Sequence, residues 1–251
     1  MPPKPQFEEL DYRETPLGEL ILRRRTVLSL DNLEVHEIIL GDSFLMSSLF
    51  TAVEIALSDL GLEALRDANI SDTGWDVVVG GLGLGYTARA ALKYPAVGSL
   101  AVVETLDAVI DWHQQGLVPL GSELSGDPRC QFVHGDFFAL ALDQSDSASF
   151  NPEKPGQKYH AVLLDIDHSP SKLLHEQNGE FYQAEGLRRL ADKLHPGGIF
   201  ALWSDDPPDD VFMKSLEEVF VSCQSYIVTF DNPIRGGESA STVYVARRSP
   251  T

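Results

Sequence analysis

The feature that most constrains the fold is a short apolar run that ends in a cluster of glycines. Val77-Val78-Val79 leads directly into Gly80-Gly81-Leu82-Gly83-Leu84-Gly85, and a helical pattern follows from Tyr86 to Tyr94. A buried strand, a tight turn and a helix are the opening unit of a parallel α/β sheet. Glycines at this turn let a ligand approach bare backbone, while the helix start supplies free N–H groups. We therefore interpret Gly80, Gly81, Gly83 and Gly85 as cofactor-binding, with glycines that serve only turn packing as the alternative.

The same rhythm continues along the chain. Further apolar runs predict strands at 100–103, 131–133, 159–164 and 199–203, with helices at 108–115 and 181–194 between them. Two closing strands are expected at 226–230 and 242–245. Such alternation indicates a Rossmann-like class I methyltransferase fold, a mostly parallel sheet with helices on both faces and an antiparallel final strand.

The segment before this unit has a different pattern. Residues 1–15 are rich in proline and charge and predict a loose arm. Residues 16–45 predict a small antiparallel β-element with a turn at Asp31-Asn32, and 47–65 an amphipathic helix. We therefore expect two units: 1–70, with the arm, the β-element and a linking helix, and 71–251, the Rossmann-like nucleoside-binding domain.

Acidic residues follow two of the predicted strands. Glu104 ends the strand after the glycine turn, where a carboxylate accepts hydrogen bonds from both ribose hydroxyls. The alternative is a solvated glutamate at a strand end. After the third strand, Asp136 is placed to accept from an adenine amine and Phe137 to cover the ring. A plain Gly-Asp turn is the alternative there.

The end of the fourth predicted strand combines two acids and a histidine. Asp165-Ile166-Asp167-His168 falls at the carboxyl edge, where open parallel sheets carry their reactive groups. Neighbouring carboxylates shift one another's pKa and can deprotonate an amine. Asp165 and Asp167 are therefore the candidate catalytic residues, with turn or helix capping by Asp167 or Ser169 as the alternative.

Charge and cysteine content narrow the class of partner. Asp and Glu number 38 against 19 Lys and Arg, for a net charge of -19, which argues against nucleic acid and favours a cationic small substrate. Acidity that serves only solubility is the alternative. The chain has two cysteines, no apolar signal region and no stretch of 18 apolar residues, so we expect a cytoplasmic protein without membrane contact. The seven histidines lack metal-ligand spacing, so no metal is expected.

Several motifs in order resemble one known family. They are Gly80 to Gly85, Val102-Val103-Glu104, Asp127-Pro128-Arg129 with Gly135-Asp136, Leu164-Asp165, Phe181-Tyr182 and Leu194-His195-Pro196-Gly197-Gly198. This set resembles the spermidine synthase (polyamine aminopropyltransferase) family, which shares its fold with class I S-adenosylmethionine-dependent methyltransferases. The resemblance implies that Glu104 holds the ribose, Asp136 holds the adenine, and Asp165 assists amine deprotonation.

The chain also departs from that family. The Asp-x-x-Asp-Pro pattern is replaced by Asp165-Ile166-Asp167-His168-Ser169-Pro170, which displaces the second acid and the proline. The Tyr-His-Glu segment before a helix is replaced by residues 41–48, with Glu54 inside the helix. The nucleoside half of the site therefore resembles the family, and the acceptor half is altered.

These features together predict a transferase. The expected co-substrate is S-adenosylmethionine or decarboxylated S-adenosylmethionine, with alkyl transfer to a small cationic amine, and a homodimer is compatible with the resemblance. A methyltransferase of a small molecule is one alternative, and a non-catalytic nucleoside-binding protein is another.

Overall fold

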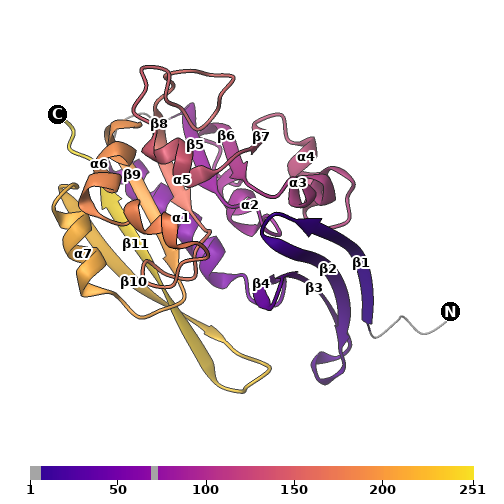
Figure 1. Ribbon diagram of the computed structural model, residues 1–251. Helices are drawn as coiled ribbons and strands as arrows, with labels where there is room; N and C mark the ends of the chain where they lie inside the picture. Colours follow the sequence, from indigo (N-terminus) through magenta and orange to yellow (C-terminus); the bar gives the residue numbers. More distant parts are fainter. Residues whose placement is uncertain (1–6, 69–72) are drawn as a thin grey trace.

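The computed structural model describes residues 7–68 and 73–251 and shows a central mixed sheet flanked by helices, with a smaller sheet beside it (Figure 1). The central sheet has seven strands in the order β10-β11-β9-β8-β5-β6-β7. Its strands are β5 (Trp75–Gly80), β6 (Val97–Glu104), β7 (Cys130–His134), β8 (Tyr159–Leu164), β9 (Leu194–Ser204), β10 (Ser222–Asp231) and β11 (Glu238–Arg247). Strands β5 to β9 pair in parallel, and β11 is antiparallel to both of its neighbours. The predicted fold class is confirmed.

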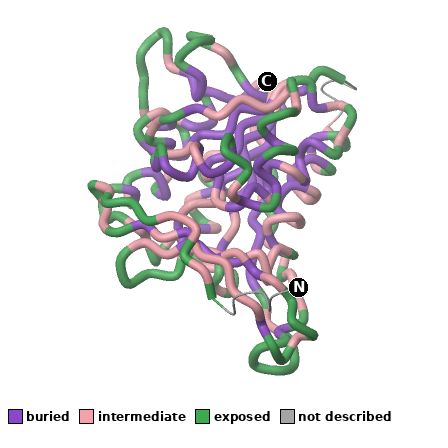
Figure 2. Tube along the Cα trace, turned by 90° about the vertical axis from the view of Figure 1, so that its right-hand side faces the viewer, coloured by how far each residue is buried: buried purple, intermediate pink, exposed green. Residues whose placement is uncertain are grey.

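Helices cover both faces of this sheet. The helices of the domain are α1 (Ala52–Asp67), α2 (Tyr86–Leu92), α3 (Asp107–Gln114), α4 (Gly121–Gly126), α5 (Phe137–Leu142), α6 (Ala184–Asp192) and α7 (Asp210–Glu217). Val77 and Val79 face a core formed with α1 to α4, and Val78 faces a second core formed with α5 to α7. Because both faces are covered, the central strands are almost continuously apolar. Figure 2 shows the buried residues gathered through the middle of the molecule and the exposed ones at its loops.

The smaller sheet is an antiparallel meander at the N-terminal end of the chain. It contains β1 (Phe7–Thr15), β2 (Gly18–Val27), β3 (Leu33–Leu40) and β4 (Ser43–Ser47), with short 3-10 turns at Leu28–Leu30 here and Glu176–Glu180 in the larger unit. The turn expected at Asp31-Asn32 is present, with φ of 51° and 61°. Leu20, Leu22 and Ile38 join the first core, so this sheet packs on the larger unit.

The loose arm predicted for residues 1–15 is wrong for residues 7–15, which form β1 and pair with β2 from Gly18 to Arg25. Its charged residues find partners far away in the sequence: Glu8 pairs with Arg24, and Asp11 accepts a hydrogen bond from Trp112 Nε1 at 2.7 Å. These contacts compensate for weak local strand propensity. Residues 1–6 of the predicted arm lie outside the described residues, as does the predicted domain boundary at 70/71, which remains a prediction.

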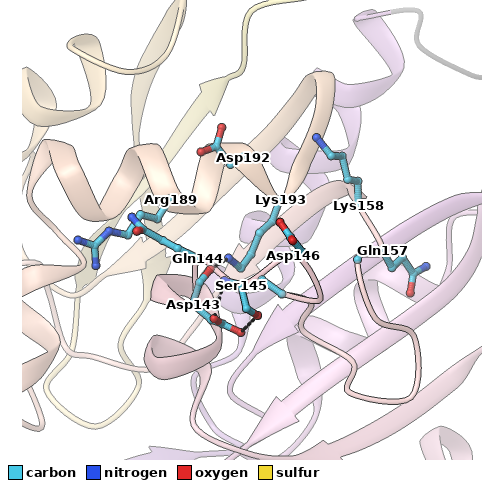
Figure 3. A pocket seen from close by; sticks show the side chains of 11 residues that line it. Asp143, Gln144, Ser145, Asp146, Gln157, Lys158, Arg189, Asp192 and Lys193 are labelled. Atoms are coloured by element: carbon cyan, nitrogen blue, oxygen red, sulfur yellow. Dashed lines mark hydrogen bonds between the residues drawn. The ribbon is translucent and has the colours of Figure 1, made fainter.

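The polar segment from 143 to 157 connects α5 to β8 and forms a surface loop, as expected. A pocket of about 330 Å³ opens between this loop and α6 (Figure 3). Lys158 and Lys193, which line it, precede β8 and β9, so the pocket lies at the amino ends of these strands. The predicted reactive groups lie at the opposite edge. Within the described residues, no helix has the length and apolar character to cross a membrane.

Candidate functional site

Three of the predicted site segments meet at the carboxyl edge of the sheet. The glycine loop follows β5, Glu104 ends β6, and Asp165 comes directly after β8; β5 lies between the other two strands. The backbone joins them closely, because Asp165 N–H donates to the Gly80 carbonyl at 2.8 Å and Gly81 N–H to the Val103 carbonyl at 2.9 Å. Segments that are far apart in the sequence thus form one continuous edge.

The glycine loop has a backbone that side chains would obstruct. Gly81 and Gly83 have φ of +94° and +46°, in the region that favours glycine. A Cβ on Gly81 would collide with the Asp165 carbonyl oxygen, and one on Gly83 with the sulfur of Met46. A Cβ on Gly80 would lie 2.6 Å from the Phe137 ring, and one on Gly85 would meet Leu124. Packing and positive φ angles therefore account for these glycines without a ligand, and ligand binding by them remains a prediction.

Glu104 is anchored at the edge by the backbone around it. Its Oε2 accepts from Leu82 N–H at 3.0 Å, and its Oε1 accepts from Leu106 N–H at 2.8 Å. Burial raises the pKa of Glu104, while these backbone donors act in the opposite direction. This geometry differs from that of a solvated strand-end glutamate. It presents an oriented carboxylate beside the loop, as the proposed ribose contact requires.

Asp136 and Phe137 serve the packing of α5. Asp136 Oδ1 accepts from Phe138 N–H at 2.9 Å and from Ala139 N–H at 3.2 Å, which caps the helix, while the residue itself is exposed. Phe137 is 1% exposed and stacks on Phe150 with ring centroids 4.9 Å apart. The structure therefore does not support the predicted role of Phe137 as a cover for adenine, because its ring lies in the second core. An exposed Asp136 carboxylate is compatible with the adenine contact.

Asp167, which was predicted to be catalytic, also has a side chain that is engaged within the protein. Its side chain is 1% exposed and accepts from Leu174 N–H at 2.7 Å, Asn178 Nδ2 at 3.0 Å and Tyr182 Oη at 2.8 Å. These donors come from the segment that leads into α6, so the carboxylate organises that segment. The contacts favour the structural alternative for Asp167 over the predicted catalytic role, because its oxygens are already occupied.

Asp165 is accompanied by a carboxyl group that sequence reasoning did not select. Thr87 Oγ1, in the first turn of α2, donates to Asp165 Oδ2 at 2.6 Å. Burial raises the pKa of Asp165 to about 6. Glu54 lies in the first turn of α1, where burial and then the negative charge of Asp165 raise its pKa to about 8. The charge of Asp165 opposes ionisation of Glu54, and the two pKa values lie on either side of 7, so near neutral pH the pair carries one proton and one charge.

Two further residues touch the glycine loop. Met46, on β4, accepts from Leu84 N–H through its sulfur at 2.8 Å. His113, on α3, donates from Nε2 to the Gly83 carbonyl at 2.9 Å, since a carbonyl can only accept. Burial lowers the pKa of His113 to about 4, so its imidazole is neutral at pH 7. Neither residue stands in a local motif, and only a reading of long-range contacts identifies them.

Metal ligation has no candidate in the part of the chain that the structure describes, where no cluster of three or more His, Cys, Asp or Glu side chains could hold an ion. The arrangement offers oriented carboxylates, backbone N–H groups and a bare glycine turn. These groups suit a polar organic ligand that lies across the ends of β8, β5 and β6.

The strand order and the glycine loop define a Rossmann-like fold of the class I methyltransferase type. Human methyltransferase-like protein 13 in complex with SAH has this fold, with a TM-score of 0.55 over 79% of the chain at 16% identity. A spermidine synthase in complex with the transition state analogue AdoDATO matches 97% of the chain and 74% of its own length, with a TM-score of 0.70 at 15% identity. The spermidine synthase from Thermotoga maritima gives a TM-score of 0.67 over 97% of the chain and 74% of its own, at 14% identity. The smaller N-terminal sheet is included in both of these matches because each covers nearly the whole chain.

Sequence similarity points to the same group. A polyamine aminopropyltransferase from Prochlorococcus marinus is 32% identical over 131 residues, which is 52% of this chain and 40% of that protein. Putrescine N-methyltransferase 2 from Nicotiana attenuata is 29% identical over 150 residues, 59% of this chain and 35% of that protein. The matches thus span about half or less of these relatives, and no family model matches the chain. The resemblance to the spermidine synthase-like family is confirmed.

The Glu54–Asp165 pair predicts an unusual dependence of stability on pH. A carboxyl group whose pKa is higher in the folded state stabilises the fold below its unfolded pKa, and the effect disappears as pH rises through the folded value. For Glu54 this window runs from 4.5 to about 8. We expect Glu54→Gln to unfold at a temperature several degrees above wild type at pH 9, with a much smaller gain at pH 5, because one pKa unit is worth about 1.4 kcal/mol.

Calorimetric melting of both proteins across this pH range is the measurement. Glu63→Gln, an exposed position on the same helix, is the matched control and should follow wild type at every pH. A difference between Glu54→Gln and wild type that stays constant from pH 5 to 9 would contradict the raised pKa.

Proposed function

We propose that this protein is a transferase that moves an alkyl group from an S-adenosyl donor to an amine acceptor. The observation that carries the proposal is a pair of electrostatically linked carboxyl groups, Glu54 and Asp165, of which Asp165 lies against Gly81 of the glycine loop. An alkyl ammonium has a pKa of about 10, so an amine arrives protonated and lacks the lone pair that attack requires. A carboxyl pair that holds one proton and one charge near pH 7 can accept the proton that the amine must lose.

The donor is proposed to lie across the three strand ends. Glu104 would accept from the ribose hydroxyls, the exposed Asp136 carboxylate from the adenine amine, and the glycine loop would pass beneath the ribose and the sulfur. In the reaction, the bond between the donor carbon and the sulfonium sulfur breaks, and a bond from that carbon to the amine nitrogen forms. The nitrogen loses a proton to the carboxyl pair, and a neutral thioether leaves. The protein's contribution is placement of both partners and removal of the proton.

The charge of the site favours a donor without a carboxylate. Burial raises the pKa of Asp165 and the Thr87 hydroxyl lowers it, while burial and Asp165 raise the pKa of Glu54. Among residues 7–68 and 73–251, no lysine or arginine acts on the pKa of either acid. A donor carboxylate beside this pair would add a further negative charge, whereas a terminal ammonium would be attracted. Decarboxylated S-adenosylmethionine has the ammonium and lacks the carboxylate. Aminopropyl transfer is therefore the leading form of the proposal.

Methyl transfer from S-adenosylmethionine to an amine is the second candidate. The similarity to the putrescine N-methyltransferases of Nicotiana, which extends over 150 residues, favours it. The same placement and proton removal serve both reactions. They differ in which carbon on the sulfonium faces the nitrogen.

One product analysis distinguishes the candidates. The purified chain is incubated with diamines and polyamines and either decarboxylated S-adenosylmethionine or S-adenosylmethionine, and products are identified by mass spectrometry. We expect methylthioadenosine and an aminopropylated amine from the first donor. S-adenosylhomocysteine and a methylated amine from the second would establish methyl transfer. Nucleoside binding by calorimetry without turnover of any amine would leave a binding protein and reject both transfer reactions.

A further inference from the structure

A methionine of the N-terminal sheet lies directly on the glycine loop. Met46 belongs to β4, the strand that leads into α1 (Figure 1). Its sulfur accepts from Leu84 N–H at 2.8 Å and occupies the space that a side chain on Gly83 would need. Met46 is therefore the residue that covers the middle of the loop.

The bond that Met46 makes is a weak one. A thioether sulfur is a poor acceptor, whereas a carboxylate oxygen forms a hydrogen bond about twice as strong as one between neutral groups. Leu84 immediately precedes Gly85, the residue before α2, so its N–H is a backbone donor of the glycine turn that a carboxylate oxygen could accept from. The methionine thus withholds a backbone donor that a carboxylate would otherwise use.

The position of Met46 relative to the donor follows from the loop. Gly81 lies against the carbonyl of Asp165, and Leu82 N–H bonds to Glu104. A nucleoside that extends from Glu104 toward Asp165 must cross the segment from Gly81 to Leu84. On that path, the chain attached to the donor sulfur would pass beside Met46, which lies on Gly83 and Leu84.

We propose that Met46 is a specificity-determining residue of the donor site, which disfavours donors that carry a carboxylate by covering Leu84 N–H with an apolar thioether. This inference rests on the proposed function, since it assumes a nucleoside donor at this edge. A donor whose chain ends in an ammonium loses nothing when this N–H is covered. A donor with a carboxylate must either displace Met46 or leave its charge without a partner.

The test compares three nucleosides in wild type and Met46→Ala by calorimetry: S-adenosylmethionine, decarboxylated S-adenosylmethionine and methylthioadenosine. Methylthioadenosine carries only a methyl group on sulfur and reports on the nucleoside half. We expect Met46→Ala to bind S-adenosylmethionine at least about tenfold more tightly relative to methylthioadenosine, the effect of one hydrogen bond to a charged group. The ratio of decarboxylated donor to methylthioadenosine should not change.

Further variants distinguish loss of the apolar cover over Leu84 N–H from a general effect of the substitution on the fold. Met213→Ala removes a half-buried methionine on α7 and should leave all ratios at their wild-type values. Met46→Leu keeps the apolar cover and should also keep the wild-type ratio. Met46→Gln keeps the side-chain length and offers an amide to a carboxylate, so it should shift the ratio as Met46→Ala does, and it serves if Met46→Ala does not fold.

Two results overturn the inference and are distinguishable. If wild type binds methylthioadenosine but neither Met46→Ala nor Met46→Gln changes the S-adenosylmethionine ratio, Met46 has no role in donor choice and the proposed function stands. If folded wild type binds none of the three nucleosides, the proposed function fails together with the inference.

Discussion

Asp165→Asn is expected to reduce turnover by about two orders of magnitude or more and to leave nucleoside affinity within a few-fold of wild type. The amide has nearly the same shape and can still accept from Thr87 Oγ1, which lies 2.6 Å from the carboxylate. It cannot take a proton from an ammonium. General base catalysis typically contributes about 10²–10⁴-fold, and this sets the size of the loss.

The loss of turnover in Asp165→Asn should become smaller as pH rises. As pH rises toward the pKa of the amine, a larger fraction arrives with its lone pair free, so the variant should recover relative to wild type. Wild-type turnover should increase with pH through the neutral range as the carboxyl pair loses its proton, because the pKa of Asp165 is raised to about 6 and that of Glu54 to about 8. Steady-state rates of both proteins between pH 6 and 10 provide the comparison.

The matched control is Asp205→Asn, an exposed acid that follows β9 at the same edge. It should keep wild-type turnover. Unchanged turnover of Asp165→Asn at pH 7 would place the base elsewhere, and Glu54 would be tested next, since the oxygens of Asp167 are occupied by Leu174, Asn178 and Tyr182. Loss of nucleoside affinity instead of turnover would assign Asp165 to the donor.

Glu104→Ala is expected to weaken binding of methylthioadenosine or an S-adenosyl donor by about 1.5–3 kcal/mol, the scale of lost hydrogen bonds to a charged group. The carboxylate also holds Leu82 N–H and Leu106 N–H, at 3.0 and 2.8 Å, so alanine additionally releases the start of the glycine loop. Both effects act in the same direction. Calorimetry measures the affinity, and circular dichroism checks the fold.

Glu104→Gln separates these two effects. Its amide oxygen keeps one of the backbone hydrogen bonds and its volume preserves the packing, but it offers a neutral acceptor in place of a charged one. We expect an intermediate loss. Wild-type affinity in a folded Glu104→Ala protein would remove Glu104 from the nucleoside site.

Local sequence pattern was sufficient for the central sheet and the edge that carries the site. Apolar runs such as Val77-Val78-Val79 are buried on both faces, as strands of a parallel sheet covered by helices are, and the right-handed crossover then restricts the strand order. Because reactive groups of such sheets follow the strands, the chain positions of Glu104 and Asp165 suffice to place both acids at one edge. The local pattern did not predict β1, because its charged residues are not typical of a strand. Arg24 and Trp112, which lie elsewhere in the chain, provide partners for these charges in the folded protein.

The sequence did not predict the direction in which the side chains of the candidate site residues point. Asp167 and Phe137 stand in the motifs, yet one carboxylate is turned toward Asn178 and Tyr182 and the ring is turned into the second core. A motif gives the position of a residue on an element, but burial and competing partners determine what that residue touches. For Asp136, the sequence did not show that its side chain caps α5 while its carboxylate stays exposed.

The sequence by itself determined the fold class, the glycine turn and the acids at the strand ends, because these depend on periodicity and spacing within one βα unit. Only the tertiary structure brought Glu54 within electrostatic reach of Asp165, Met46 onto Leu84 and His113 to the Gly83 carbonyl. Each of these interactions joins elements that are far apart in the chain. They depend on how the N-terminal sheet and the helices α1 and α3 pack against the glycine loop, and this packing is a property of the assembled core that no local pattern encodes.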